Sequence, residues 1–109
     1  MEFEVTYKNY KEEVEKSEKP VLLYFWTEWC NPCRVMDPVI SQIAEEYESV
    51  IKVGKVNCDE EVELGAKFGA MSIPKMVLVK NGEVAASSAG FQPKATLETN
   101  LGLNELKYK

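Results

Sequence analysis

Hydrophobic residues fall into five short runs that predict β-strands. The run 21–26, Val-Leu-Leu-Tyr-Phe-Trp, is apolar on both faces, which is typical of a central strand covered by helices on each side. Asn81 and Gly82 separate the last two runs, and both tolerate a positive φ, so they predict a two-residue hairpin turn. The predicted strands are 2–6, 21–26, 50–56, 75–80 and 83–88.

Apolar residues spaced three and four apart predict four helices between and after these strands. Pro93 suits the first turn of the last helix, which is expected to bury Leu97 and Leu101. Gly102 either ends this helix or weakens it. The predicted helices cover about 7–17, 34–48 and 60–68, and the last begins near residue 93.

The first three helices have further recognisable signals. Thr6 is a plausible N-cap for the first helix. Asp59 is expected to cap the third, and Gly69 to end it. The apolar stripe of the first helix is Tyr7, Tyr10 and Val14, and that of the second is Val35, Met36, Val39, Ile40, Ile43, Ala44 and Tyr47.

The order of these elements defines an α/β fold. Helical connections between early strands predict parallel pairing, whereas the late hairpin predicts antiparallel pairing. The result is a central mixed five-stranded sheet flanked by four helices. A chain of 109 residues has the size of one domain, so a single domain over 1–109 is expected.

Charge and composition limit the partners. The net charge is −5 and Lys and Arg do not cluster, so nucleic acid is not expected as a partner. No apolar run is long enough for a membrane span, and the acidic start lacks the features of a signal peptide. We therefore expect a cytoplasmic protein with no membrane association, and a monomer by default.

The chemistry is predicted to centre on the segment Trp29-Cys30-Asn31-Pro32-Cys33. Its first cysteine falls where a strand gives way to a helix, and unpaired N–H groups at a helix start stabilise a thiolate. Residues three apart share a helix face, so a disulfide between Cys30 and Cys33 is possible. Pro32 fits the first helical turn. This pattern indicates a thiol–disulfide redox site.

Other interpretations of the cysteines are a purely structural pair, or half of a metal site shared across a dimer. Zinc usually takes four ligands, and the chain has no histidine and one further cysteine, so no metal site is expected within one chain. The third cysteine, Cys58, follows an apolar strand. It is either core packing or a regulatory or dimer-forming thiol.

Across almost its whole length the chain resembles the thioredoxin family. The family motif Trp-Cys-Gly-Pro-Cys-Lys is matched by Trp29 to Arg34, with Asn31 in place of glycine. The other matches are the helix proline at Pro38, the cis Ile-Pro at Ile73-Pro74, the hairpin Lys-Asn-Gly-Glu at 80–83, and the active-site glycine at Gly90.

The resemblance implies a thioredoxin fold and a protein-disulfide reductase or electron carrier. Cys30 would be the exposed nucleophile that attacks a target disulfide, and Cys33 would resolve the mixed disulfide. No cofactor would be bound, because a thioredoxin reductase supplies the reducing equivalents. Disulfide-containing target proteins are the other expected partners. The implied target-binding residues are Trp29, Ser72, Ile73, Pro74, Ala89 and Gly90.

Departures from the family concern residues expected to modulate the redox pair. Tyr24 replaces the buried aspartate that usually exchanges a proton with the second cysteine, and Lys55 matches a lysine near it. We therefore expect Cys33 to lose its proton through water or to Lys55. Asn31, beside Pro32, is expected to change the thiol–disulfide balance. Lys75 places a positive charge near the site.

The sequence is also compatible with two other functions. One is a thioredoxin-like oxidant or isomerase, which the changes at Tyr24 and Asn31 allow. The other is a module of the same fold that binds a partner protein without redox turnover.

Overall fold

The five predicted strands form one mixed sheet in the computed structural model, which describes residues 2–107. Their spatial order is β1-β3-β2-β4-β5. Strands β1, β3 and β2 run parallel, whereas β4 is antiparallel to both β2 and β5. The strands are β1 (Glu2–Glu4), β2 (Val21–Trp26), β3 (Lys52–Asn57), β4 (Lys75–Lys80) and β5 (Glu83–Ala89). The expected mixed sheet is confirmed. The prediction of one domain over 1–109 includes residues 1, 108 and 109, which lie outside the described part.

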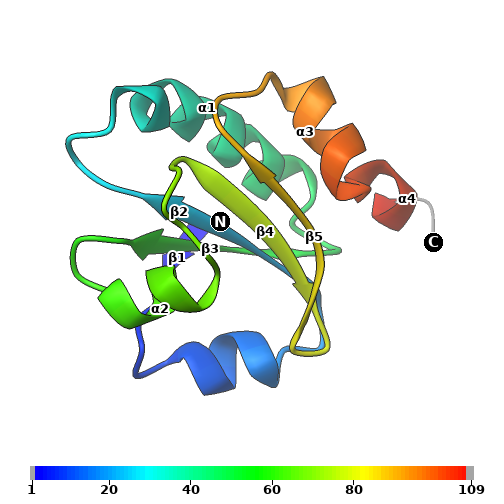
Figure 1. The fold of residues 1–109 in the computed structure, drawn as a ribbon. Helices are drawn as coiled ribbons and strands as arrows, with labels where there is room; N and C mark the ends of the chain where they lie inside the picture. Colours follow the sequence, from blue (N-terminus) through cyan, green and yellow to red (C-terminus); the bar gives the residue numbers. More distant parts are fainter. Residues whose placement is uncertain (1, 108–109) are drawn as a thin grey trace.

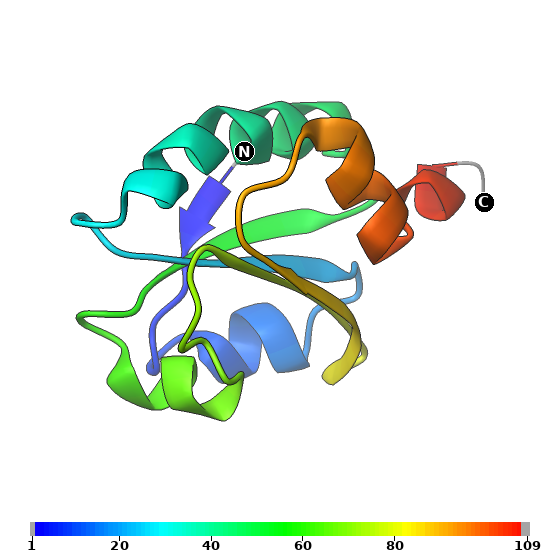
Figure 2. The same cartoon turned by 45° about the horizontal axis from the view of Figure 1, so that its top comes forward.

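Helical segments cover both faces of the sheet (Figure 1). Helices α1, α3 and α4 lie on one face, and α2 lies on the other with a short π-helical segment, η1 (Figure 2). The helical segments are η1 (Lys11–Glu15), α1 (Asn31–Glu46), α2 (Val62–Lys67), α3 (Lys94–Leu101) and α4 (Leu103–Lys107).

The first helical segment differs from the expected α-helix. The N–H of Lys16 donates to the carbonyl of Lys11, five residues back, at 3.0 Å, which widens the turn. Thr6 is not the N-cap of this segment, which is Tyr10; the Thr6 hydroxyl accepts from the N–H of Asn9 at 3.3 Å in the preceding turn. Tyr7 is 67% exposed, so its assignment to the apolar stripe is wrong. Tyr7 lies in a turn before η1 begins, so helical spacing does not describe the direction of its side chain.

The structure decides the open question at Gly102 and corrects two further helix predictions, those for Val35 and Asp59. Gly102 adopts φ 68° and ends α3, so the last predicted helix becomes two. Val35 is 56% exposed and does not join the buried face of α1. Asp59 does not cap α2, whose N-cap is Glu61, because the Asp59 side chain has another partner described below.

A hydrophobic core lies on each face of the sheet. Strand β2 contributes alternate side chains to the two cores, as expected for a strand that is apolar on both faces. Val21, Leu23 and Phe25 face η1 and α2, whereas Leu22 and Tyr24 face α1. All five are buried. Tyr24 therefore lies directly under the helix that begins next to the two cysteines.

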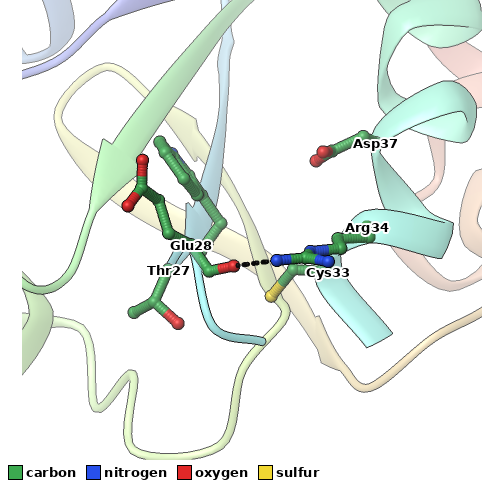
Figure 3. A pocket seen from close by; sticks show the side chains of 6 residues that line it. Thr27, Glu28, Cys33, Arg34 and Asp37 are labelled. Carbon is green, nitrogen blue, oxygen red and sulfur yellow. Dashed lines mark hydrogen bonds between the residues drawn. The ribbon is translucent and has the colours of Figure 1, made fainter. Parts of the chain in front are cut away.

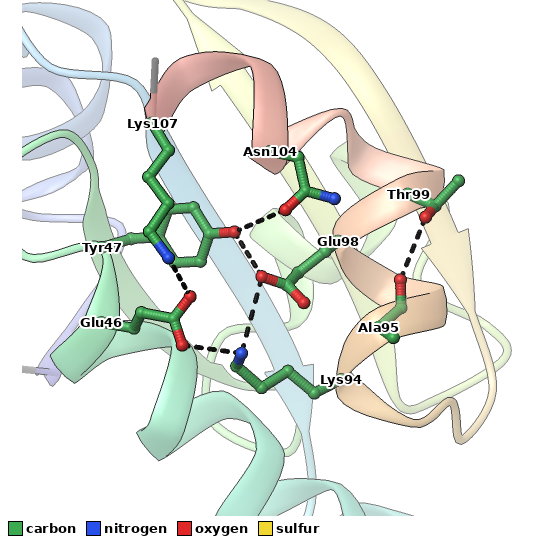
Figure 4. A network of polar contacts seen from close by, with 8 residues as sticks. All are labelled: Glu46, Tyr47, Lys94, Ala95, Glu98, Thr99, Asn104 and Lys107. Carbon is green, nitrogen blue, oxygen red and sulfur yellow. Dashed lines mark hydrogen bonds and ion pairs between the residues drawn. The ribbon is translucent and has the colours of Figure 1, made fainter.

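A polar network joins the end of α1 to α3 and α4 (Figure 4). The Glu46 carboxylate pairs with Lys94 at 2.7 Å and with Lys107. The hydroxyl of buried Tyr47, directly after α1, donates to Glu98 and contacts the Asn104 side-chain oxygen at 3.2 Å. These contacts fix the far end of the helix that carries the redox cysteines.

Candidate active site

A disulfide joins Cys30 and Cys33 at the start of α1, with their Cα atoms 5.2 Å apart. Cys30 is the N-cap, and its Sγ accepts the backbone N–H of Cys33 at 3.2 Å. Pro32 occupies the first turn, where its missing N–H leaves no helical bond unmade. Asn31 is the exposed first residue of the helix. The geometry directs helix N–H groups at the Cys30 sulfur, the arrangement that favours a thiolate.

The accessibility of the two cysteines differs from the sequence expectation. Cys30 is 5% exposed and Cys33 2% exposed in this disulfide form. Cys30 is thus the more accessible of the two, but the expectation of an exposed sulfur is wrong here. The exposure of a side chain at a helix start depends on tertiary packing, which local sequence patterns do not report.

The segment before β4 and the segment after β5 meet at the same edge of the sheet as the cysteines. Lys75 pairs with Phe25 near the end of β2 and with Ala89 at the end of β5. The N–H of Gly90 donates to the carbonyl of Pro74 at 2.7 Å, and Gly90 takes φ 85°. The Ile73–Pro74 peptide bond is cis, as the family resemblance implied. Ser72 and Ala89 are exposed, and Ile73 and Gly90 are half-buried.

Trp29 lies beside the cysteines and is 69% exposed. Its indole N–H donates to the Asp59 carboxylate at 2.9 Å, which anchors the ring to the loop between β3 and α2. The N–H of Asp59 is itself bound by the Asn57 side chain at 2.9 Å. Asp59 is a site residue that sequence reasoning missed, since nothing in a local pattern links positions thirty residues apart.

Tyr24 connects β2 to the first turns of α1. Its hydroxyl lies 2.7 Å from Asp37 Oδ1 and 2.8 Å from the carbonyl oxygen of Cys33. Burial raises the pKa of Tyr24 well above its ordinary value, and the hydrogen bond and charge of Asp37 raise it further. Tyr24 therefore keeps its proton at neutral pH. Asp37 was also missed from the sequence, although it lies four residues after Cys33 and so on the same helix face.

A pocket of about 430 Å³ opens beside Cys33 (Figure 3). Arg34 crosses it and donates to the backbone carbonyl of Glu28 at 3.1 Å. Trp26 Nε1 and Thr27 Oγ1 are buried and have no hydrogen-bond partner within residues 2–107. The pocket is lined by Trp26, Thr27, Glu28, Cys33, Arg34 and Asp37. It thus combines a sulfur, a carboxylate and polar atoms able to hold water.

Two lysines near the site have other partners than expected. The Lys55 ammonium lies 5.0 Å above the Trp26 ring and 5.9 Å above the Tyr24 ring. Aromatic faces thus replace the ion partner that the substitution at Tyr24 removed. Lys75 donates to the carbonyl of Phe68 at 2.7 Å, at the end of α2. The Lys75 ammonium therefore contacts the C-terminal end of α2 and is not directed at the cysteines.

Cys58 lies at the margin of the core on the α2 side and is half-buried. Its N–H donates to the carbonyl of Trp26 at 2.9 Å. Burial raises the pKa of this thiol, and the charge of Asp59 adds to the effect. Because the thiolate is the reactive form, these features favour packing over a reactive or regulatory thiol.

Residues 2–107 contain neither a metal-binding cluster nor a membrane-spanning helix. No group of three or more acidic, cysteine or histidine side chains is arranged to hold a metal ion within this range. No helix in the same range is both long and apolar enough to cross a membrane.

The fold and the site together define a thiol–disulfide oxidoreductase that works through a Cys-x-x-Cys couple. The thioredoxin family model matches residues 2–102. Similar proteins include thioredoxin of Porphyra purpurea, 46% identical over 90% of this chain and 92% of the relative. Thioredoxin of Rickettsia bellii is 47% identical over 85% and 89%, and thioredoxin 1 of a Nostoc species is 43% identical over 90% and 92%.

The chain belongs to the thioredoxin family. It is a protein-disulfide reductase whose dithiol–disulfide couple is Cys30–Cys33, and its targets contain disulfides.

Proposed function

We propose that Cys30 attacks the target disulfide and that Cys33 resolves the mixed disulfide. The carrying observation is the position of Cys30 as N-cap of α1, where the Cys33 N–H points at its sulfur. The Cys30 thiolate forms a bond to one target sulfur, and the other target sulfur leaves as a thiolate. Cys33 then attacks Cys30, closes the disulfide and releases the reduced target.

The target peptide is proposed to bind across the sheet edge beside the disulfide. Trp29 offers an exposed aromatic face there, and Asp59 anchors its indole group. The start of β4 pairs with the end of β5, so the segment before β4 and the segment after β5 lie at the same end of the sheet. The proposed contact residues are Trp29, Ser72, Ile73, Pro74, Ala89 and Gly90. Asn31, Pro32, Tyr24 and Lys55 are proposed to modulate the couple.

The cysteine pair itself carries the two electrons, so we propose that the protein needs no bound cofactor. A thioredoxin reductase is the proposed source of reducing equivalents. The reaction and the free Cys58 suit a reducing compartment, which supports a cytoplasmic location. We further propose that the chain acts as a monomer with a single domain over 1–109.

Cysteine variants test the order of attack. A Cys33→Ser variant is expected to remain covalently bound to a disulfide-containing peptide, because the mixed disulfide at Cys30 cannot be resolved. A Cys30→Ser variant is expected to lose almost all reductase activity and to trap no peptide. Mass spectrometry of the adduct identifies the bonded cysteine.

The matched control is Cys58→Ser, which removes the third thiol and is expected to keep the activity. An adduct at Cys33, or equal trapping by the two active-site variants, contradicts the proposed order.

A further inference from the structure

The resolving cysteine needs a proton acceptor, and this chain lacks an acid at position 24. Because the thiolate is the attacking form of a thiol, the Cys33 thiol must give up its proton for the resolving step. Tyr24 cannot accept this proton, since its own proton is held firmly. The Lys55 ammonium lies over the Trp26 and Tyr24 rings.

We propose that the Asp37 carboxylate, one helical turn after Cys33, accepts the Cys33 proton in the resolving step, and that Tyr24 positions it. This rests on the proposed roles of the two cysteines. The supporting geometry is the shared pocket, which Cys33 and Asp37 both line from the same helix (Figure 3).

The Tyr24 hydroxyl is suited to hold Asp37 in both of its protonation states. It has one proton but faces two acceptors, Asp37 Oδ1 and the Cys33 carbonyl. When Asp37 is ionised, Tyr24 donates to it. When Asp37 carries a proton, it can donate to the Tyr24 oxygen while Tyr24 donates to Cys33. A proton can thus arrive at Asp37 without leaving a polar group unpaired.

The pocket also offers a route for the proton. Cys33 and Asp37 both line the pocket, whose volume of about 430 Å³ has room for several water molecules. A proton then passes from the Cys33 thiol through water to the Asp37 carboxylate.

Charges from every neighbouring element face this pair. On α1 the charged neighbour is Arg34, which is held by the Glu28 carbonyl in the preceding loop. The same loop contributes Glu28, which also lines the pocket. Strand β3 contributes Lys55, above the Tyr24 ring. Strand β1 contributes Glu2, whose charge acts on Tyr24 and whose carboxylate accepts from the Ser41 hydroxyl.

Asp37 gains the proton of Cys33, and the Cys33 sulfur attacks the Cys30 sulfur of the mixed disulfide. The Cys30–Cys33 bond forms as the bond from Cys30 to the target sulfur breaks. The electron pair leaves with the target sulfur, which takes up a proton from Asp37 or water. The target is reduced and the cysteine pair is oxidised.

The test is stopped-flow reaction of the reduced protein with dithiobis(nitrobenzoate), in a Cys58→Ser background. Attack by Cys30 releases the first coloured thiolate at a rate that depends on reagent concentration. Attack by Cys33 releases the second at a rate that does not. The first phase tests the proposed role of Cys30, and the second alone tests Asp37.

Asp37→Asn is expected to slow the second phase about tenfold or more at pH 7 and to leave the first within about twofold, because general-base assistance commonly contributes at least this much. As pH rises, the second-phase rate of Asp37→Asn should increase with the fraction of Cys33 thiolate. Above about pH 9 it should approach the second-phase rate of the unsubstituted protein. Tyr24→Phe, which keeps the ring but releases Asp37, should give a smaller slowing with the same pH trend.

Glu28→Gln is the matched control, since it removes the same charge from the same pocket. It is expected to leave both phases unchanged. A second phase within about twofold of the unsubstituted protein from pH 6 to 9 in Asp37→Asn overturns the proposal. So does equal slowing of both phases, or an effect of Glu28→Gln as large as that of Asp37→Asn.

Discussion

Tyr24 serves both the core and the redox site. Its ring is fully buried between β2 and α1, among Leu22, Met36 and Ile40. Its hydroxyl reaches two groups of the helix that carries Cys33. Replacement by the family's aspartate would therefore remove a large core side chain as well as change the acid–base chemistry. Tyr24→Phe is the cleaner probe, because it deletes only the hydroxyl.

Tyr24→Phe is predicted to lower the free energy of unfolding by about 1–2 kcal/mol, since it loses a buried hydrogen bond. Tyr24→Asp should lower it by about 3–5 kcal/mol, because a cavity replaces the ring. Urea denaturation measures both. Tyr7→Phe is the matched control at an exposed tyrosine and is expected to change stability by less than about 0.5 kcal/mol. Equal stability of the two Tyr24 variants would contradict the packing role.

Strand β1 packs closely onto β3 because Gly54 has no side chain. A Cβ built at Gly54 would lie 2.5 Å from Val5 Cγ2 and 3.3 Å from the tip of the Phe3 ring. The close approach lets Phe3 and Val5 cover the α2 face of the sheet. Gly54 thus leaves the space in which Phe3 and Val5 pack against the sheet.

Gly54→Ala is predicted to destabilise the protein by about 1–3 kcal/mol through overpacking. The matched control is Gly65→Ala in α2, where the new Cβ would lie 3.7 Å from Cys58 Sγ, an ordinary contact. Alanine is the better helix former, so this variant should gain up to about 1 kcal/mol. Thermal or urea unfolding compares the two. Similar effects of the same sign would refute the explanation.

Over the whole molecule, the Glu46 network ties three helices together at the end of α1 away from the cysteines (Figure 4). Hydrogen bonds from Lys107, then from Lys94, hold the pKa of Glu46 below its ordinary range. A carboxylate whose pKa falls on folding contributes stability above its unfolded pKa and loses it as pH falls through the folded pKa. The network is thus expected to weaken in acid.

Glu46→Gln is predicted to lower Tm at pH 7. The difference from the unsubstituted protein should shrink as pH falls below about 4.3, the ordinary glutamate pKa, and vanish in stronger acid. Calorimetry across pH 2–7 measures this. Glu45→Gln, an exposed neighbour on the same helix, is the control and should show little difference at any pH. A Tm difference for Glu46→Gln that is constant with pH would contradict the ion-pair explanation.

The strands, their mixed pairing and the redox pair could be predicted from the sequence, because they depend on local signals. Alternation and apolar runs define strands, Asn81-Gly82 defines the hairpin, and Cys30 with Cys33 needs only three residues of spacing. The π turn of η1 and the full break at Gly102 could not be predicted in this way. Both depend on how the segment packs onto the rest of the protein.

The contacts between distant side chains at the site could not be predicted from the sequence. Asp59 reaches Trp29 across thirty positions, and Tyr24 on β2 meets Asp37 on α1. Periodicity indicated that Tyr24 is buried, but not which helix residue receives its hydroxyl. The physical reason is that hydrogen bonds between elements depend on the register and rotation at which the elements pack, and these are set by the whole core.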